Sequence, residues 1–207
     1  MTFNLVETLM TLTLFGAEWV LWLLLALSIL SVGVILERGL FFFRIRNDFT
    51  SLSQKLSDLL SEEKWDEAIR FCEENPSVEA KVALWGLNRR NKGPKAMASS
   101  MEGCAAGEKN KLDRGLVILG TLGNNAPFIG LFGTVIGIIE AFHKLSSDPE
   151  GGASVVMGSI SEALIATAVG LMVAIPAVIA FNAYNRNVRK HMSNIQSLIQ
   201  MILSFQR

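Results

Sequence analysis

One acid and two threonines stand in parts of the chain that are otherwise apolar. Glu162 comes directly before the charge-free stretch 163–185, Thr167 lies within that stretch, and Thr134 lies within another. A carboxylate at membrane depth costs on the order of 3 kcal/mol unless it is paired, protonated or facing water. A threonine hydroxyl can both donate and accept a hydrogen bond. Together these groups could bind a proton or a small cation and help it cross a membrane.

Each of these residues also has a structural interpretation that the spacing leaves open. Thr134 and Thr167 can bond to a helix carbonyl one turn back, which any threonine in a membrane helix can do. If the helix begins only at Ala163, Glu162 is an interfacial residue that favours the helix N-terminus. Glu140 and His143 follow the second apolar stretch, and we interpret them as solvated residues of the interface.

Small residues recur beside these polar groups. In lipid there is no hydrophobic drive between helices, so close contact depends on small residues that let two backbones approach. The spacing therefore predicts tight helix packing, at least partly within one chain. Pro127 and Pro176 each remove a helix hydrogen bond and predict a kink. The predicted packing residues are Gly130, Gly133, Gly137, Ala163, Ala166, Gly170 and Ala174.

The elements that must position these residues are three membrane helices. Half of the residues are hydrophobic and only 18% are charged, which is too apolar for an ordinary soluble domain of 207 residues. The stretches 19–36, 115–142 and 158–185 are long enough to approach or exceed the roughly 30 Å of a bilayer core. Residues 1–18 hold no Lys or Arg, which argues against a cleaved signal peptide. We expect an all-α membrane protein.

The distribution of basic residues predicts the orientation. Fourteen Lys and Arg residues lie between Arg38 and Arg114, Lys144 stands alone in the second connection, and four follow from Arg186 to Arg207. The positive-inside rule then places segments 37–114 and 186–207 on the cytoplasmic side of the membrane. The N-terminal segment 1–18 and the short loop 143–157 are expected outside.

The segment 37–114 is expected to be helical. Apolar residues at 49–60 predict one helix, a second is expected near Ser61 because that hydroxyl could cap it, and Gly93-Pro94 predicts a break before a further helix. Beyond the third span, apolar residues recur every three or four positions. This helical extension could pack on its own chain or between subunits, and we weigh the two about equally. Its apolar positions are Val188, Met192, Ile195, Ile199 and Ile202.

Several functional classes lack their sequence signatures. There is no phosphate-binding loop, nucleophile elbow or metal-ligand cluster, so we expect no enzyme activity, no cofactor and no metal. Nineteen basic and nineteen acidic residues give no global positive field for nucleic acid. Cys72 and Cys104 belong to no CxxC motif and are expected to be reduced.

Two segments resemble a known family. APFIGLFGTVIGII at 126–139 and ISEALIATAVGLMVAIPA at 160–177 are similar to the signature motifs of the MotA/TolQ/ExbB proton-channel family. Three spans with a long first cytoplasmic region resemble its TolQ/ExbB branch. The first 115 residues match by architecture and not by motif.

The resemblance implies a specific machine. It would be a pentameric ring whose second and third helices line a pore around the single transmembrane helices of two TolR/ExbD-like partner chains. The partner helix carries an aspartate that exchanges protons, and rotation of the ring couples ion flow to work. Thr134 and Thr167 correspond to the family's pore threonines, and Glu162 corresponds to its intramembrane glutamate. The effector could be TonB-like, TolA-like or part of a gliding machinery.

Two other functions fit the sequence. The chain could be a passive membrane scaffold that anchors a partner helix, or a stand-alone ion channel. Glu162 is the only acid near a span apart from residues at the span ends, so the chain has no proton carrier in the middle of the membrane. This disfavours the stand-alone channel and predicts that a partner supplies the carrier. The choice between H⁺ and Na⁺ stays open, because hydroxyls suit either.

Overall fold

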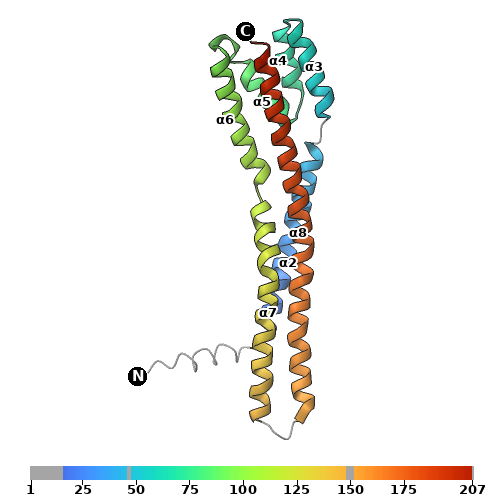
Figure 1. Ribbon diagram of the computed structural model, residues 1–207. Coiled ribbons are helices and arrows are strands. Elements are labelled where there is room, and N and C mark those ends of the chain that lie inside the picture. Colours follow the sequence, from blue (N-terminus) through green and yellow to red (C-terminus); the bar gives the residue numbers. More distant parts are fainter. Residues whose placement is uncertain (1–15, 46–47, 148–151, 207) are drawn as a thin grey trace, which may run out of the picture. The chain divides into compact units, whose positions relative to one another are not determined.

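The computed structural model describes residues 16–45, 48–147 and 152–206 (Figure 1). Its regular elements are α-helices apart from one 3-10 turn, η1 (Arg90–Lys92), and the described residues contain no strand. The predicted all-α class is confirmed. Most of the predicted segment 1–18 and the centre of the predicted loop 143–157 lie outside the described residues.

The chain divides into two compact units. The apolar unit comprises residues up to Leu36 together with Val117–Phe181, and the polar unit comprises Glu37–Leu116 and Asn182–Arg207. Three helices are long and apolar enough to cross a membrane, as predicted. They are α2 (Glu18–Arg44), α7 (Leu116–Ser147) and α8 (Gly152–Ser204), and they extend beyond the predicted spans.

In the apolar unit, α7 and α8 lie side by side with their backbones in contact (Figure 1). A Cβ atom at Gly130 would lie 2.7 Å from the carbonyl oxygen of Ala166, and one at Gly137 would lie 2.6 Å from Cβ of Ala163. A Cβ at Gly170 would lie 2.7 Å from the carbonyl oxygen of Ala126. Small side chains are therefore required along this contact, where van der Waals packing replaces the missing hydrophobic drive.

Helix α2 covers one side of this pair. Its Val20 and Leu24 are completely buried in a cluster of apolar residues with Ile136 of α7 and Val173 of α8. Helices α7 and α8 both remain α-helical through their prolines, Pro127 and Pro176. The predicted kinks at these two positions stay predictions.

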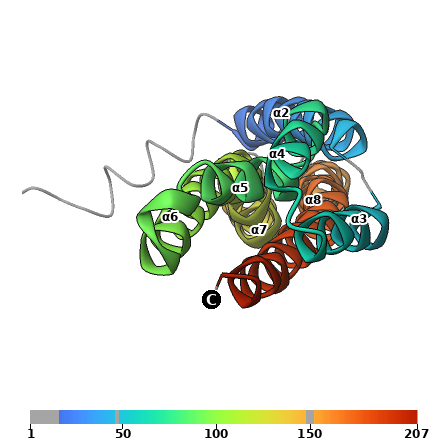
Figure 2. The ribbon, with the colours of Figure 1, turned by 90° about the horizontal axis from the view of Figure 1, so that it is seen from above.

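The polar unit is a row of helices that pack in chain order (Figure 2). They are α3 (Phe49–Ser61), α4 (Trp65–Glu74), α5 (Val78–Leu87) and α6 (Pro94–Asp113). The expected break at Gly93-Pro94 is confirmed, since Pro94 occupies the first turn of α6. The expected helix start near Ser61 is wrong, because Ser61 ends α3 and its hydroxyl donates to the carbonyl of Asp58. Glu63 then adopts a left-handed φ of 57°, which turns the chain before α4.

The second half of α8 packs within its own chain. Its apolar face is buried in the polar unit, which favours the first of the two accounts of this extension. Met192 is only partly buried, and Leu198, which the predicted stripe does not include, is 1% exposed. The buried positions are Val188, Ile195, Leu198, Ile199 and Ile202.

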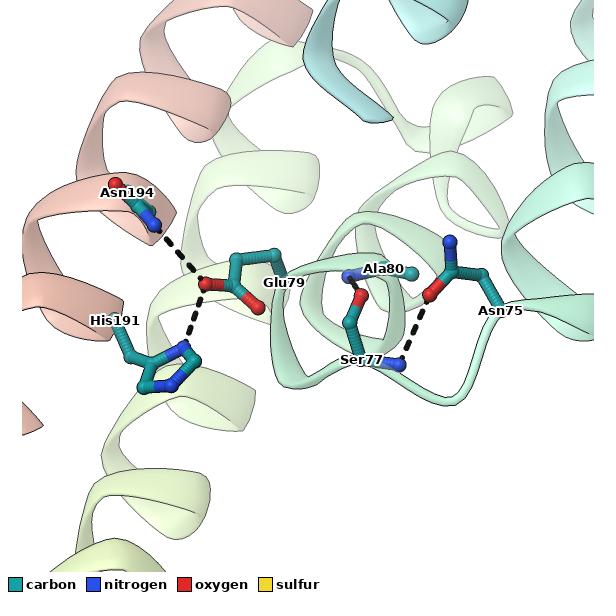
Figure 3. A network of polar contacts seen from close by, with 6 residues as sticks. All are labelled: Asn75, Ser77, Glu79, Ala80, His191 and Asn194. Atoms are coloured by element: carbon teal, nitrogen blue, oxygen red, sulfur yellow. Dashed lines mark hydrogen bonds and ion pairs between the residues drawn. The ribbon is translucent and has the colours of Figure 1, made fainter. Parts of the chain in front are cut away.

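A buried carboxylate links α5 to α8 in the polar unit (Figure 3). Glu79 is 3% exposed, and its Oε1 lies 2.7 Å from Nδ1 of His191 and accepts a hydrogen bond from Asn194 Nδ2 at 3.3 Å. Burial alone raises the pKa of the Glu79 carboxyl. The hydrogen bonds from His191, from its own backbone N–H and from Asn194, together with the charge of His191, outweigh burial and lower that pKa.

We predict that Gly130→Ala weakens the contact between α7 and α8. The added methyl would meet the backbone of α8, which cannot move away as a side chain can, so the free energy of unfolding should fall by about 1–3 kcal/mol. Thermal unfolding in detergent measures the change. Gly158→Ala on α8 is the matched control, because a Cβ there has no neighbour within 4 Å. Equal behaviour of the two variants would contradict the packing account.

We also predict that Glu79→Gln lowers the free energy of unfolding by about 1–2 kcal/mol near neutral pH, because charged hydrogen bonds are replaced by neutral ones. Because the pKa of Glu79 is lowered in the folded protein, its ionised carboxylate stabilises the fold at pH values above its ordinary pKa of 4.5. That stability is lost as the pH falls through the folded-state pKa. Unfolding curves of both proteins should therefore converge in acid. Glu73→Gln, at an exposed position on α4, should change little at any pH.

Candidate functional site

Thr134 and Thr167 lie on the same flank of the α7–α8 pair. A Cβ at Gly130 would lie 3.0 Å from Cα of Thr167, and Thr134 is one helical turn along α7 from Gly130. Helix α2 packs against the other flank, where the apolar cluster includes Ile136 of α7 and Val169 of α8. At about 100° per residue, Thr134 points roughly 160° around α7 from Ile136, and Thr167 points roughly 160° around α8 from Val169. Both threonines therefore point away from α2.

The two hydroxyls differ in their hydrogen bonds. Thr134 is 7% exposed and its Oγ1 donates to the carbonyl of Leu131 at 2.6 Å. Thr167 Oγ1 is enclosed and has no hydrogen-bond partner among the described residues. The structural alternative of a bond to a helix carbonyl therefore holds for Thr134 and fails for Thr167. An enclosed hydroxyl without a partner costs about 1–3 kcal/mol, and such a group calls for an explanation.

Glu162 lies well inside a helix. Because α8 begins at Gly152, Glu162 is ten residues from the helix start, which removes the alternative of a residue at the N-terminus. Its side chain is exposed and forms no ion pair within the part of the chain that the structure describes. It precedes Thr167 by five residues and therefore points about 140° away around α8. Within one chain, the structure does not bring Glu162 to the threonine flank.

Lys144 contacts two polar side chains near the start of α8. Its Nζ lies 2.7 Å from Oε1 of Glu140, one turn earlier on α7, and donates to Oγ of Ser159 on α8 at 3.5 Å. Ser159 is buried, and Glu140 is three-quarters buried at its side chain. The expectation that Glu140 is solvated is wrong, because its carboxylate is largely buried and paired with Lys144, and the four-residue spacing of the two is the sequence signal for this pair. His143 is exposed, as expected.

The described residues contain no group of three or more His, Cys, Asp or Glu side chains placed to hold a metal ion. Both cysteines are free. Burial and, to a smaller extent, the neighbouring Glu73 charge together raise the pKa of Cys72 to about 12, so this side chain stays a thiol near neutral pH. The hydroxyl flank is therefore the arrangement best suited to chemistry, because hydroxyls can solvate an ion or a carboxyl group.

Comparison with known proteins agrees with the motifs. The model of the MotA/TolQ/ExbB proton channel family matches residues 74–197, a range that includes Thr134, Glu162 and Thr167. This match begins in the polar unit, so it covers part of the region expected to match by architecture alone.

Individual relatives extend the similarity to most of the chain. The chain is 33% identical over 178 residues to the biopolymer transport protein ExbB of Neisseria meningitidis, with 81% of each protein covered. It is 32% identical over 196 residues to the ExbB protein of Xanthomonas campestris, covering 83% of this chain and 74% of that one. It is 44% identical over 89 residues to the Tol-Pal system protein TolQ of Pseudomonas aeruginosa, covering 43% of this chain and 38% of that one.

Proposed function

Because the chain belongs to the MotA/TolQ/ExbB proton channel family, we propose that it is the ring-forming subunit of an inner-membrane motor driven by an ion gradient. Five copies form the ring, and together with a partner protein they conduct protons and convert the flow into mechanical work at the envelope. The names of its relatives point to biopolymer transport or to a Tol-Pal system as the process served.

The observation that carries the proposal is the unpartnered hydroxyl of Thr167, which is enclosed beside the α7–α8 contact on the side away from α2. Helix α2 occupies the opposite flank of α7 and α8, so the threonine flank is the one available to face the interior of a ring. Five such flanks would line the pore with two hydroxyls each, about one helical turn apart. Thr134 already donates to a carbonyl, so its oxygen remains free to accept.

The chain's own carboxylate does not occupy this flank. Glu162 points to the other side of α8, so a carboxyl group solvated by Thr167 must come from another protein. A single-span TolR/ExbD-like chain with an aspartate in its membrane helix supplies it, in two copies per ring. A buried carboxylate is stable only when it is protonated or solvated.

The symmetry mismatch then makes the cycle stepwise, and the ion gradient drives it. A five-fold ring cannot match two partner helices equivalently, so one aspartate at a time meets a hydroxyl flank and ionises there. The other aspartate stays protonated against apolar residues. Each proton exchange favours a step of the ring around the partner. An effector of the TonB, TolA or gliding type would take up this motion.

The distribution of basic residues supports an orientation of the chain in the membrane. Fourteen basic residues in 37–114 favour placing this segment, and with it the C-terminus, in the cytoplasm, with the N-terminus outside. Lipid covers the exposed apolar side chains of α2 and the outer faces of the ring.

We predict that Thr167→Val abolishes gradient-dependent activity while leaving the ring assembled, because the near-isosteric side chain keeps packing and deletes the hydroxyl. Complementation of a strain that lacks this protein measures the activity, and proton flux with the partner in liposomes measures conduction. Ser161→Ala is the matched control, since Ser161 is exposed on the face of α8 opposite to the α7 contact. Its hydroxyl donates only to the carbonyl of Met157.

The same assays separate the rival functions. Full activity of both Thr167→Val and Thr134→Val would show that the hydroxyls are structural and would favour the passive scaffold. Large proton flux through the chain without a partner would favour the stand-alone channel.

We further predict that Glu162→Gln reduces activity more than Glu140→Gln. The Glu140 charge is balanced by a direct ion pair with Lys144 on the same helix, whereas Glu162 forms no ion pair among the described residues and interacts with Lys144 only at longer range, so its charge or its proton is available for function. The same complementation assay ranks the two variants, with protein levels matched. Equal losses would remove the functional role of Glu162.

A further inference from the structure

An open groove of about 410 Å³ runs between α5 and α6 of the polar unit. Trp85 and Arg89 line one side, and Ser99 and Gly103 of α6 line the other. The indole of Trp85 is 51% exposed, although this segment lies outside the apolar stretches. A Cβ at Gly103 would meet no atom within 4 Å, so the α6 side of the groove has free space above its backbone.

The two ends of the helix row carry opposite charge. Residues 48–74, which contain α3 and α4, have eight acids and three bases, whereas residues 78–114, which contain α5 and α6, have four acids and eight bases. Two of the four acids in the second segment are buried and bonded, Glu79 to His191 and Glu108 to Lys81 and Lys111, and Arg90 pairs with Asp66 of α4. With these pairs set aside the second segment still carries more bases than acids, namely Arg89, Lys92, Lys95, Lys109 and Arg114 against Glu102 and Asp113. Since the helices pack in chain order, α3 and α6 lie at opposite ends of the row (Figure 2).

We propose that the groove between α5 and α6 binds the acidic α3–α4 edge of a second copy of this chain. This proposal rests on the proposed ring function and names the contact that closes the ring outside the membrane helices. A closed ring needs a head-to-tail interface made from two different surfaces of each subunit. The polar unit has two such surfaces with complementary charge, the α5–α6 groove with Arg89 and the exposed acids of α4, and the Arg90–Asp66 ion pair at 3.2 Å shows the same charge pairing within one chain.

Charge also decides against pairing of the groove with itself. A two-fold contact would bring Arg89 of one copy close to Arg89 of the other, and like charges at an interface are repulsive. Against the acidic edge, Arg89 instead meets carboxylates and can bind one in a bidentate manner. Glu67, Glu73 and Glu74 are exposed on α4 and are available for this contact.

The groove supplies the apolar part of the same interface. Exposed tryptophan and arginine side chains are the types that contribute most to binding energy when a partner buries them. The small residues on α6 allow the helix of a neighbour to come close beside the Trp85 indole. The contact thus has an aromatic anchor, a close helix approach and a charged rim.

Cysteine cross-linking in membranes tests the contact in the full-length protein. Ser99→Cys places a thiol in the groove, and Glu67→Cys places one on the acidic edge; Cys104→Ser removes the native groove thiol. Cys72 remains, because it is buried. With a bismaleimide reagent, chains that carry both new cysteines should give a ladder of covalent oligomers. A co-expressed mixture of the two single-cysteine chains should give dimers only, and either single-cysteine chain alone should stay monomeric on denaturing gels.

Other band patterns would overturn the proposal. Dimers from the Ser99→Cys chain alone would mean that the groove pairs with itself. Absence of cross-links, while the native protein still runs as an oligomer in detergent, would place the ring contact elsewhere and leave the proposed function intact. Absence of cross-links from a protein that is monomeric in detergent would contradict both the contact and the ring.

A charge reversal provides a second, independent measurement. Arg89→Glu should lower the yield of the cross-linked ladder about fivefold, which corresponds to roughly 1 kcal/mol. Arg189→Glu reverses an exposed charge on α8, outside both surfaces, and should leave the yield unchanged. Equal yields from the two variants, with both proteins assembled, would show that Arg89 does not contact the acidic edge and would overturn the proposal.

Discussion

The direct contact between the backbones of α7 and α8 is the constraint on which the rest of the apolar unit depends. Lipid gives these helices no hydrophobic reason to associate, so the contact must come from dense packing of small residues. Gly130 and Gly170 face each other closely enough that a Cβ at Gly130 would lie 3.2 Å from Cα of Gly170. With both backbones fixed in this way, the side chains beside the contact have little freedom. The glycine contact therefore sets the flank on which Thr134 and Thr167 lie, and Thr134 adds its own hydrogen bond to the Leu131 carbonyl.

The close packing of α7 on α8 was predictable from the sequence, because it depends on spacing within single helices. Glycines and alanines three or four residues apart share a face, and the threonines follow them. The position of Glu162 was also available, since five residues along a helix turn it about 140° from Thr167. Grouping all three residues as pore-lining came from the family motif, which records residue types and not angular positions. The structure separates them within one chain.

Other features depend on long-range contacts and could not be predicted. Glu79 stands in a charged segment and resembles a surface residue, yet it is buried because α8 returns 112 positions later with His191. The helix start near Ser61 was wrong for a related reason. A capping residue was present, but the apolar period of α3 continued through Leu60, which is 2% exposed, and burial of that face outweighed the local cap.

The burial of a carboxylate has a different meaning in each of the two units, as Glu79 and Glu162 show. In the polar unit, a buried carboxylate with several hydrogen bonds is a satisfied structural group, and removing it costs stability. In a membrane span the surrounding solvent is apolar, so the anomaly is the carboxylate that faces outward from its chain without an ion pair. On the proposed function, Glu162 would need a proton, water or a neighbouring protein in addition to the longer-range attraction of Lys144. An exposed acid on a membrane helix is thus itself an argument that the functional state of this protein is an assembly.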